Sequence, residues 1–205
     1  MEPYAHYDQQ VYKERPMPSM TEATKTCLKK YSTFSGRARR SEYWWFFLAQ
    51  YLIGIAVSII WVICFIAQMA IWIKNGSIND HSPFDVFLTN PGFWLYAVYC
   101  LALIVPNLSV TVRRLHDIGR SGWFLLLFCL CPVLLFGAAF LIAYYDHDLW
   151  FLMIFAYLAS IFLSVLYIVW MATNGKKETN KWGPSPKYYQ DQPQNIQSEP
   201  QSEQQ

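Results

Sequence analysis

Long apolar blocks alternate with short polar segments along this chain. Four blocks contain no Asp, Glu, Lys or Arg, and they lie at 44–73, 93–112, 123–145 and 149–172. Each reaches the roughly 20 apolar residues that an α-helix needs to cross a bilayer, whereas membrane strands read as alternating segments of about ten residues. The pattern therefore predicts an all-α polytopic membrane protein with four transmembrane helices in a bundle.

The last two blocks are separated by a short polar turn, Asp146-His147-Asp148. Helices joined by so few residues pack as antiparallel neighbours. We therefore expect the third and fourth transmembrane helices to form a hairpin.

Positive charge is distributed unevenly between the segments that flank the blocks. Fifteen of the 16 Lys and Arg residues lie within 1–43, 113–122 and 173–205, and Lys74 is the remaining one. Cytoplasmic segments of membrane proteins carry an excess of Lys and Arg. This distribution predicts that both termini face the cytoplasm.

The composition agrees with a membrane protein and excludes other classes. Hydrophobic residues are 54% of the 205 residues and charged residues 15%, against a charged share of about 25% in soluble domains. A disordered chain and a nucleic-acid-binding module with a basic surface are both excluded. No cysteine pair has metal or redox spacing, and neither a metal site nor a cofactor is predicted.

The polar ends of the chain frame a central membrane domain. Ser19 followed by Glu22 is a capping box, and apolar residues then recur at helical spacing. This predicts a helix at about 21–34, either lying on the membrane surface or extending the first span. The chain is thus divided into a flexible segment at 1–20, a membrane domain at 21–187 and a disordered Gln-rich tail at 188–205.

Two segments hold six of the seven arginines: residues 34–45, before the first span, and residues 112–123, between the second and third. The guanidinium group is a rigid fork of donors that suits phosphate or carboxylate. If the second span continues as a helix to residue 120, Arg113 faces Asp117 at i,i+4, as His116 faces Arg120.

The first arginine segment also holds its own carboxylate and a helix breaker. Glu42 follows Arg39 by three residues and is the expected partner in this segment. Gly36 is expected to separate the surface helix from the first span, and Gly119 to end the second.

Several polar residues lie within the spans. Gln50, Gln68, Asn107, Ser109 and Thr111 are candidates for hydrogen bonds between helices. Pro106 either kinks the second span without further effect or frees carbonyl groups for a transported substrate.

Several motifs together resemble one protein family. They are Phe34-Ser35-Gly36-Arg37, Arg40-Ser41-Glu42-Tyr43-Trp44, Arg113-Arg114-Leu115-His116-Asp117, Gly119-Arg120-Ser121-Gly122-Trp123 and Asn180-Lys181-Trp182-Gly183-Pro184-Ser185-Pro186. Over about residues 30–187 the chain resembles the bacterial inner-membrane family known as domain of unknown function 805, which includes proteins of the YhaH and YhaI type. Lys181 and Ser185 depart from the usual closing motif. The resemblance implies a four-helix inner-membrane protein without established activity, and it supplies no catalytic residues.

These features are compatible with three interpretations of the protein's function. The first is binding of an anionic lipid headgroup or a phosphorylated ligand by Ser35, Arg37, Arg40, Arg113, Arg114, His116, Asp117 and Arg120. The second is a structural or partner-binding scaffold in which the arginines fix topology. The third is a small transporter or channel subunit, although no span carries an ionisable residue.

The sequence also supports expectations about catalysis and about binding partners. His116-Asp117 lacks an accompanying nucleophile motif, phosphate loop or metal-spaced cluster, so no enzyme activity and no catalytic residues are predicted. The expected partners are membrane lipids, anionic ones included, and further copies of the chain or another membrane protein, with no nucleic acid.

Overall fold

The computed structural model describes residues 12–77 and 82–190, so the predictions for residues 1–11 and 191–205 lie outside the described part. Four helices in this part are long and apolar enough to cross a membrane: α2 (Arg40–Lys74), α4 (Pro91–Asp117), α5 (Phe124–Tyr145) and α6 (Phe151–Ala172). The shorter elements are β1 (Tyr12–Glu14), α1 (Met20–Lys29), α3 (Pro83–Thr89), η2 (His147–Leu149) and β2 (Tyr188–Gln190). The predicted all-α class is confirmed.

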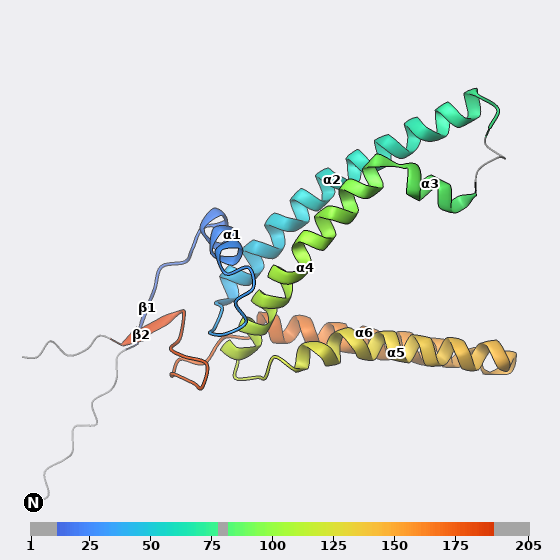
Figure 1. Ribbon diagram of the computed structural model, residues 1–205. Helices are drawn as coiled ribbons and strands as arrows, with labels where there is room; N and C mark the ends of the chain where they lie inside the picture. The colour runs from blue at the N-terminus through green and yellow to red at the C-terminus, as the bar shows by residue number, and fades with distance from the viewer. Residues whose placement is uncertain (1–11, 78–81, 191–205) are drawn as a thin grey trace, which may run out of the picture.

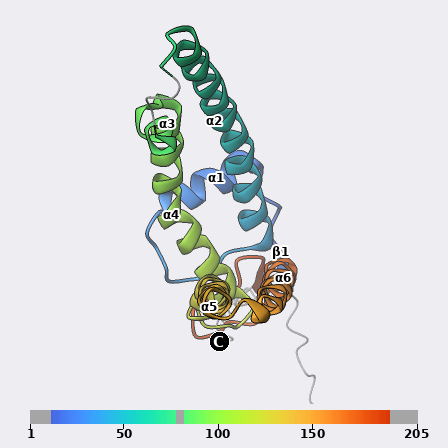
Figure 2. The ribbon, with the colours of Figure 1, turned by 90° about the vertical axis from the view of Figure 1, so that its right-hand side faces the viewer.

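The long helices pack as two antiparallel pairs, α2 with α4 and α5 with α6 (Figure 1). The three-residue η2 joins α5 to α6, which confirms the predicted hairpin. The two pairs meet at one end of the molecule and diverge from it, as Figures 1 and 2 both show. We call this end, where α2 and α5 begin and α4 and α6 end, the junction.

The best-packed part of the protein is the junction. Its hydrophobic core combines residues from α1, α2, α4 and α6 with one from the turn before α2, and they are Cys27, Ala38, Tyr43, Phe46, Val110, Leu115 and Met171. In contrast, most of the large side chains of α5 and α6 are exposed and available to lipid. Folding energy from apolar burial is therefore concentrated where the helix pairs meet.

Helix α1 has the predicted capping box. The Ser19 N–H donates to the Glu22 carboxylate over 2.9 Å, and the Glu22 N–H donates to Ser19 Oγ over 3.3 Å. The helix ends at Lys29, five residues before the expected end. The residues that follow Lys29 turn towards α4 instead, where the Ser109 hydroxyl donates to the carbonyls of Lys30 and Thr33.

The same turn satisfies a carbonyl that Pro106 leaves without a helical donor. A proline has no N–H, so the carbonyl of Ala102, four residues earlier, loses its partner. The Tyr31 hydroxyl donates to that carbonyl over 2.6 Å. Pro106 thus provides an attachment point for the segment after α1.

Helices α2 and α4 approach closely at the end opposite the junction. A Cβ added at Gly92 would lie 2.7 Å from Trp61 Cα, so glycine is required for this contact. Asn90 caps α4 by accepting from the Phe93 N–H, and its amide donates to Gln68 over 2.9 Å. The predicted role of Gln68 between the helices is confirmed.

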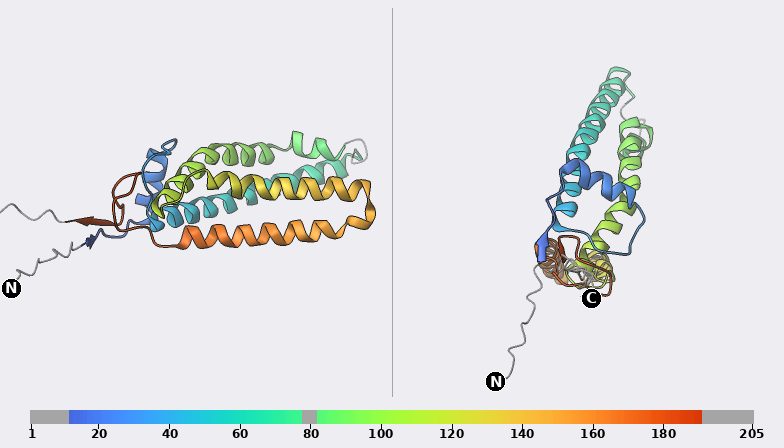
Figure 3. Two further views of the ribbon diagram at one scale, coloured as in Figure 1. Left: turned by 90° about the horizontal axis from the view of Figure 1, so that it is seen from below. Right: turned by 90° about the vertical axis from the view of Figure 1, so that its left-hand side faces the viewer.

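Both ends of the described chain lie at the junction (Figure 3). Strands β1 and β2 form an antiparallel pair in which Lys13 is opposite Tyr189. Strand β1 lies within the segment 1–20 that was expected to be flexible. The two ends are therefore on the same side of the four long helices.

Candidate functional site

Arg37 lies in the turn between α1 and α2 and is buried at the junction. Its Nε donates to Asp117 Oδ1 over 2.9 Å. Its Nη1 donates to the carbonyls of Glu178 (2.8 Å) and Gly183 (3.2 Å), and its Nη2 to that of Lys176. One guanidinium thereby joins the turn before α2, the end of α4 and the segment after α6.

Asp117, the last residue of α4, lies between two arginines. Its Oδ2 accepts from Arg114 Nη1 over 2.5 Å. Arg114 also donates to the carbonyls of Met171 and Thr173 at the end of α6, where carbonyls lack helical partners. The i,i+4 pair predicted between Arg113 and Asp117 is wrong, because Arg114 makes this contact at i,i+3.

Arg113 instead crosses to α2. Its Nη1 donates to Glu42 Oε1 over 2.8 Å, and the Cys27 thiol approaches the same oxygen at 3.6 Å. The predicted Arg39–Glu42 pair is therefore wrong, and Arg39 donates to the carbonyls of Arg15 and Pro16. Glu42 is buried with α1 and α4, whereas Arg39 precedes α2 on its outer side.

Cys27 is completely buried in this contact. Burial, and next the negative charge of Glu42, raise the pKa of the Cys27 thiol to about 12. The thiol therefore stays protonated at neutral pH and packs as a small apolar group.

His116 is bound by residues far from it in sequence. Its Nδ1 lies 3.1 Å from the Gly36 carbonyl oxygen, and its ring stacks on Trp182 with centroids 4.5 Å apart. The predicted pair with Arg120 is wrong because α4 ends at Asp117. Gly119 adopts φ +82° after it, as expected for a helix terminator, and redirects the chain.

The segment 173–187 after α6, which we call the strap, completes the junction. Its role could not be predicted from local spacing, although Trp182 and Gly183 of its closing motif are a sequence signal for it. A Cβ at Gly175 would lie 1.9 Å from Asp117 Oδ2, so only glycine fits there. The Asn180 amide donates to the His116 carbonyl over 2.9 Å.

The predicted ligand-binding residues fall into two groups. Arg37, Arg113, Arg114, His116 and Asp117 are buried together and bonded to protein groups. Ser35, Arg40 and Arg120 are exposed. Arg120 lies over the Trp170 ring, 4.4 Å from its centroid, and Arg40 borders a cavity.

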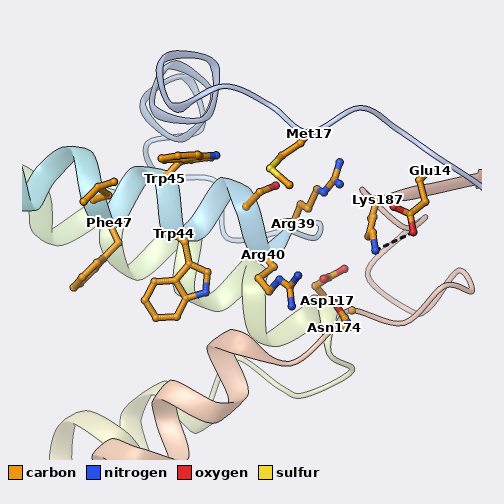
Figure 4. A pocket seen from close by; sticks show the side chains of 13 residues that line it. Glu14, Met17, Arg39, Arg40, Trp44, Trp45, Phe47, Asp117, Asn174 and Lys187 are labelled. Carbon is orange, nitrogen blue, oxygen red and sulfur yellow. Dashed lines mark ion pairs between the residues drawn. The ribbon is translucent and has the colours of Figure 1, made fainter.

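This cavity, the junction cavity, has a volume of about 650 Å³ and begins at the first turn of α2. Arg39, Arg40 and Lys187 lie around its polar end, and Trp44 and Phe47 lie farther along α2 (Figure 4). Cations and aromatic side chains therefore border the same space. Arg39 and Lys187 were not predicted as site residues, because the segments that carry them meet only in the folded chain.

Three cations, Arg39, Arg40 and Lys187, and two carboxylates, Glu14 and Asp117, line the cavity, so positive charge is in excess by one. Lys187 is paired with Glu14 at 3.0 Å, which lowers the pKa of Glu14. Arg40 is exposed, and its guanidinium donates to the Ala172 carbonyl over 3.3 Å. Ser41 also lines the cavity, and its Oγ is buried without a hydrogen-bond partner among the described residues.

Two amide side chains within the spans are bonded to each other. Gln50 and Asn107 donate to each other over 2.8 Å in both directions, which confirms their predicted role between helices.

Within residues 12–77 and 82–190, no group of three or more His, Cys, Asp or Glu side chains is placed to hold a metal ion.

Four apolar helices joined at a charged junction define a multi-pass helical membrane protein. The family model described as protein of unknown function (DUF805) matches residues 31–184, and the chain belongs to this family. The resemblance drawn from the arginine motifs is thereby confirmed.

Two relatives are inner-membrane proteins of Escherichia coli strain K12. The chain is 36% identical to Inner membrane protein YhaI over 101 residues, which are 49% of this chain and 65% of YhaI. It is 33% identical to Inner membrane protein YhaH over 101 residues, 49% of this chain and 67% of YhaH. The match thus spans less than two thirds of YhaI. No solved structure matches the chain. The protein is a multi-pass inner-membrane protein of an uncharacterised family.

Proposed function

We propose that this protein binds a phosphate-bearing anion in the junction cavity, at the cytoplasmic edge of the inner membrane. The observation that carries the proposal is the cavity itself, in which Arg39, Arg40 and Lys187 surround one end while Trp44 lines the other. Guanidinium groups bind phosphate through paired donors, and tryptophan favours the headgroup region of a bilayer.

Arg40 is the principal ligand residue in this proposal. Its guanidinium is exposed, and within the described part of the chain only Nη1 donates a hydrogen bond, which leaves further N–H donors for an anion. It also occupies the first turn of the 35-residue helix α2, whose N-cap residue Arg39 makes no side-chain capping bond. The positive end of the helix dipole therefore adds to the attraction for an anion.

The buried arginines have a different role. Arg37, Arg113 and Arg114 are each bonded to carboxylates or to backbone carbonyls. We infer that they hold the two helix pairs and the strap together, as in the scaffold reading of the sequence. We therefore assign ligand binding to the cations that line the cavity, Arg39, Arg40 and Lys187.

The cytoplasmic placement rests on charge. The junction and the segments that join it hold fifteen of the 16 Lys and Arg residues. The remaining Lys74 ends α2 on the opposite side. Because positive segments are retained in the cytoplasm, we place the junction and both termini there.

The test is binding of glycerol phosphate and of dioleoyl phosphatidylglycerol to the detergent-purified full chain by native mass spectrometry. We expect Arg40→Ala to weaken both by about tenfold, the value of one charge-assisted hydrogen bond. Lys74→Ala, at the far end of α2, is the control and retains wild-type binding. A wild-type protein that binds neither compound overturns the proposal and leaves the scaffold reading.

A further inference from the structure

A second groove continues from the junction cavity along α2. It lies between α2 and α4, has a volume of about 600 Å³, and is lined by Tyr51, Ile55, Tyr99 and Leu103 among others. Phe47 lines both the junction cavity and this groove. The two spaces are therefore adjacent, with a charged end at the junction and an apolar end within the span.

Eight of the α2 residues that border the two spaces lie on one face of the helix, and Ser41, Trp45 and Gln50 border the spaces from either side of it. The eight are Arg40, Trp44, Phe47, Leu48, Tyr51, Gly54, Ile55 and Ser58. Their spacing of three and four residues is that of a single stripe along an α-helix. An elongated molecule lying on this stripe would contact the cation first and apolar side chains afterwards.

The length of the stripe suits one leaflet of a bilayer. Arg40 and Tyr51 are 11 residues apart, which is about 17 Å along the helix axis at 1.5 Å per residue. Half of a hydrocarbon core of about 30 Å is about 15 Å. A chain that starts at Arg40 thus reaches the middle of the bilayer near Tyr51.

Four polar side chains of the groove, those of Gln50, Ser58, Tyr99 and Asn107, are bonded within the protein. Gln50 and Asn107 are paired with each other, and the Tyr99 hydroxyl donates to the Gln50 carbonyl. The Ser58 hydroxyl donates to the Ile55 carbonyl over 2.8 Å. The groove consequently presents apolar surface, which favours a hydrocarbon chain over a polar substrate.

We propose that the bound anion is a membrane phospholipid, with its phosphate in the junction cavity and an acyl chain in the α2–α4 groove. This inference rests on the proposed function and specifies its ligand. A lipid differs from a free phosphorylated metabolite in this respect, because only the lipid occupies both the junction cavity and the α2–α4 groove. The groove is then a binding surface for one chain of that lipid.

The test uses a substitution that fills the groove and leaves the cations of the junction cavity unchanged. Ile55 and Ile53 are both exposed residues of α2, but only Ile55 lines the groove. We would compare Ile55→Trp with the matched control Ile53→Trp, using the full chain in detergent and native mass spectrometry. The probes are dioleoyl phosphatidylglycerol, which has chains, and glycerol phosphate, which has none.

The expected result is that Ile55→Trp weakens binding of dioleoyl phosphatidylglycerol by about tenfold, the equivalent of losing about two buried methylene groups. It leaves glycerol phosphate binding unchanged, and Ile53→Trp changes neither. Equal lipid binding by the two variants overturns the acyl-chain assignment while leaving the anion site intact. If Arg40→Ala binds both probes as well as the wild-type protein does, the proposed function itself is overturned.

Discussion

Arg37 and Asp117 are 80 positions apart in the sequence, yet Arg37 Nε donates to Asp117 Oδ1 over 2.9 Å in a site closed to solvent. Asp117 also accepts from Arg114, so a single carboxylate is bonded to two guanidiniums. The pair connects the entrance of the first transmembrane helix to the exit of the second. Arg114 joins these two helices to the end of α6 through the carbonyls of Met171 and Thr173.

Replacing Asp117 by Asn should therefore destabilise the junction strongly. Both Arg37 and Arg114 would remain buried without a carboxylate, and breaking a buried pair from one side costs about 3–5 kcal/mol. Thermal unfolding of the detergent-purified protein would measure the loss. Asp148→Asn, in the turn between α5 and α6, is the control and should change the unfolding temperature little. Equal stability of the two variants would show that the Asp117 carboxylate is dispensable.

The contact between Arg113 and Glu42 should behave as a coupled pair. Their atoms are 2.8 Å apart, and both side chains are buried. In a double-mutant cycle with Arg113→Ala and Glu42→Ala, we expect a coupling free energy of about 1–3 kcal/mol. Unfolding in increasing denaturing detergent provides the four stabilities. Additive effects would contradict a direct interaction.

Gly175 should tolerate no side chain. A Cβ there would lie 1.9 Å from Asp117 Oδ2, so Gly175→Ala must displace the strap or the carboxylate. We expect faster proteolysis of the strap and a lower unfolding temperature. Gly137→Ala is the matched control, since Gly137 lies within α5 and a Cβ there meets nothing within 4 Å. That control should be neutral or stabilising by up to about 1 kcal/mol.

Cys27 should be unreactive in the folded protein. Its pKa of about 12, against 9.0 for an ordinary thiol, lowers the reactive thiolate fraction about a thousandfold, and the sulfur is also buried. Because the folded pKa is the higher one, the stability due to the protonated thiol is complete below pH 9 and declines as the pH rises towards 12. Labelling with a charged maleimide at neutral pH, before and after denaturation, measures the protection. Rapid labelling of the native protein at Cys27 would contradict it.

The orientation can be tested with reporter fusions. We expect alkaline phosphatase, which is active only outside the cytoplasm, to be active when fused after Lys74 and inactive when fused at the C-terminus. The reason is the excess of Lys and Arg at the junction end. The reverse pattern of activity would place the junction outside the cytoplasm.

Local features of the sequence predicted local structure well. The apolar blocks predicted four long helices, Ser19 and Glu22 the cap of α1, and Gly119 the end of α4. Each depends on neighbouring residues only: the length of an apolar run, a cap three residues from its partner, or a glycine that adopts positive φ. Interhelical bonding of Gln50 and Asn107 also followed, because buried amides require partners.

The partners of the charged residues did not follow from spacing. Helical periodicity placed Arg113 opposite Asp117, but Arg113 bonds Glu42 from another helix and Asp117 bonds Arg37 from a turn. Spacing along one helix shows which side chains share a face, and it carries no information on which segment covers that face.

By itself, the sequence determined the membrane class, the long helices and the segregation of positive charge, since these depend on composition and on residues close together in the chain. Only the tertiary structure decided that Arg37, Arg113 and Arg114 are buried in the junction, each bonded to a carboxylate, and that Arg40 borders a cavity. The physical reason is that a guanidinium bonds whichever carboxylate or carbonyl folding brings near it. Here those groups include the carbonyl of Glu178, 141 positions from Arg37.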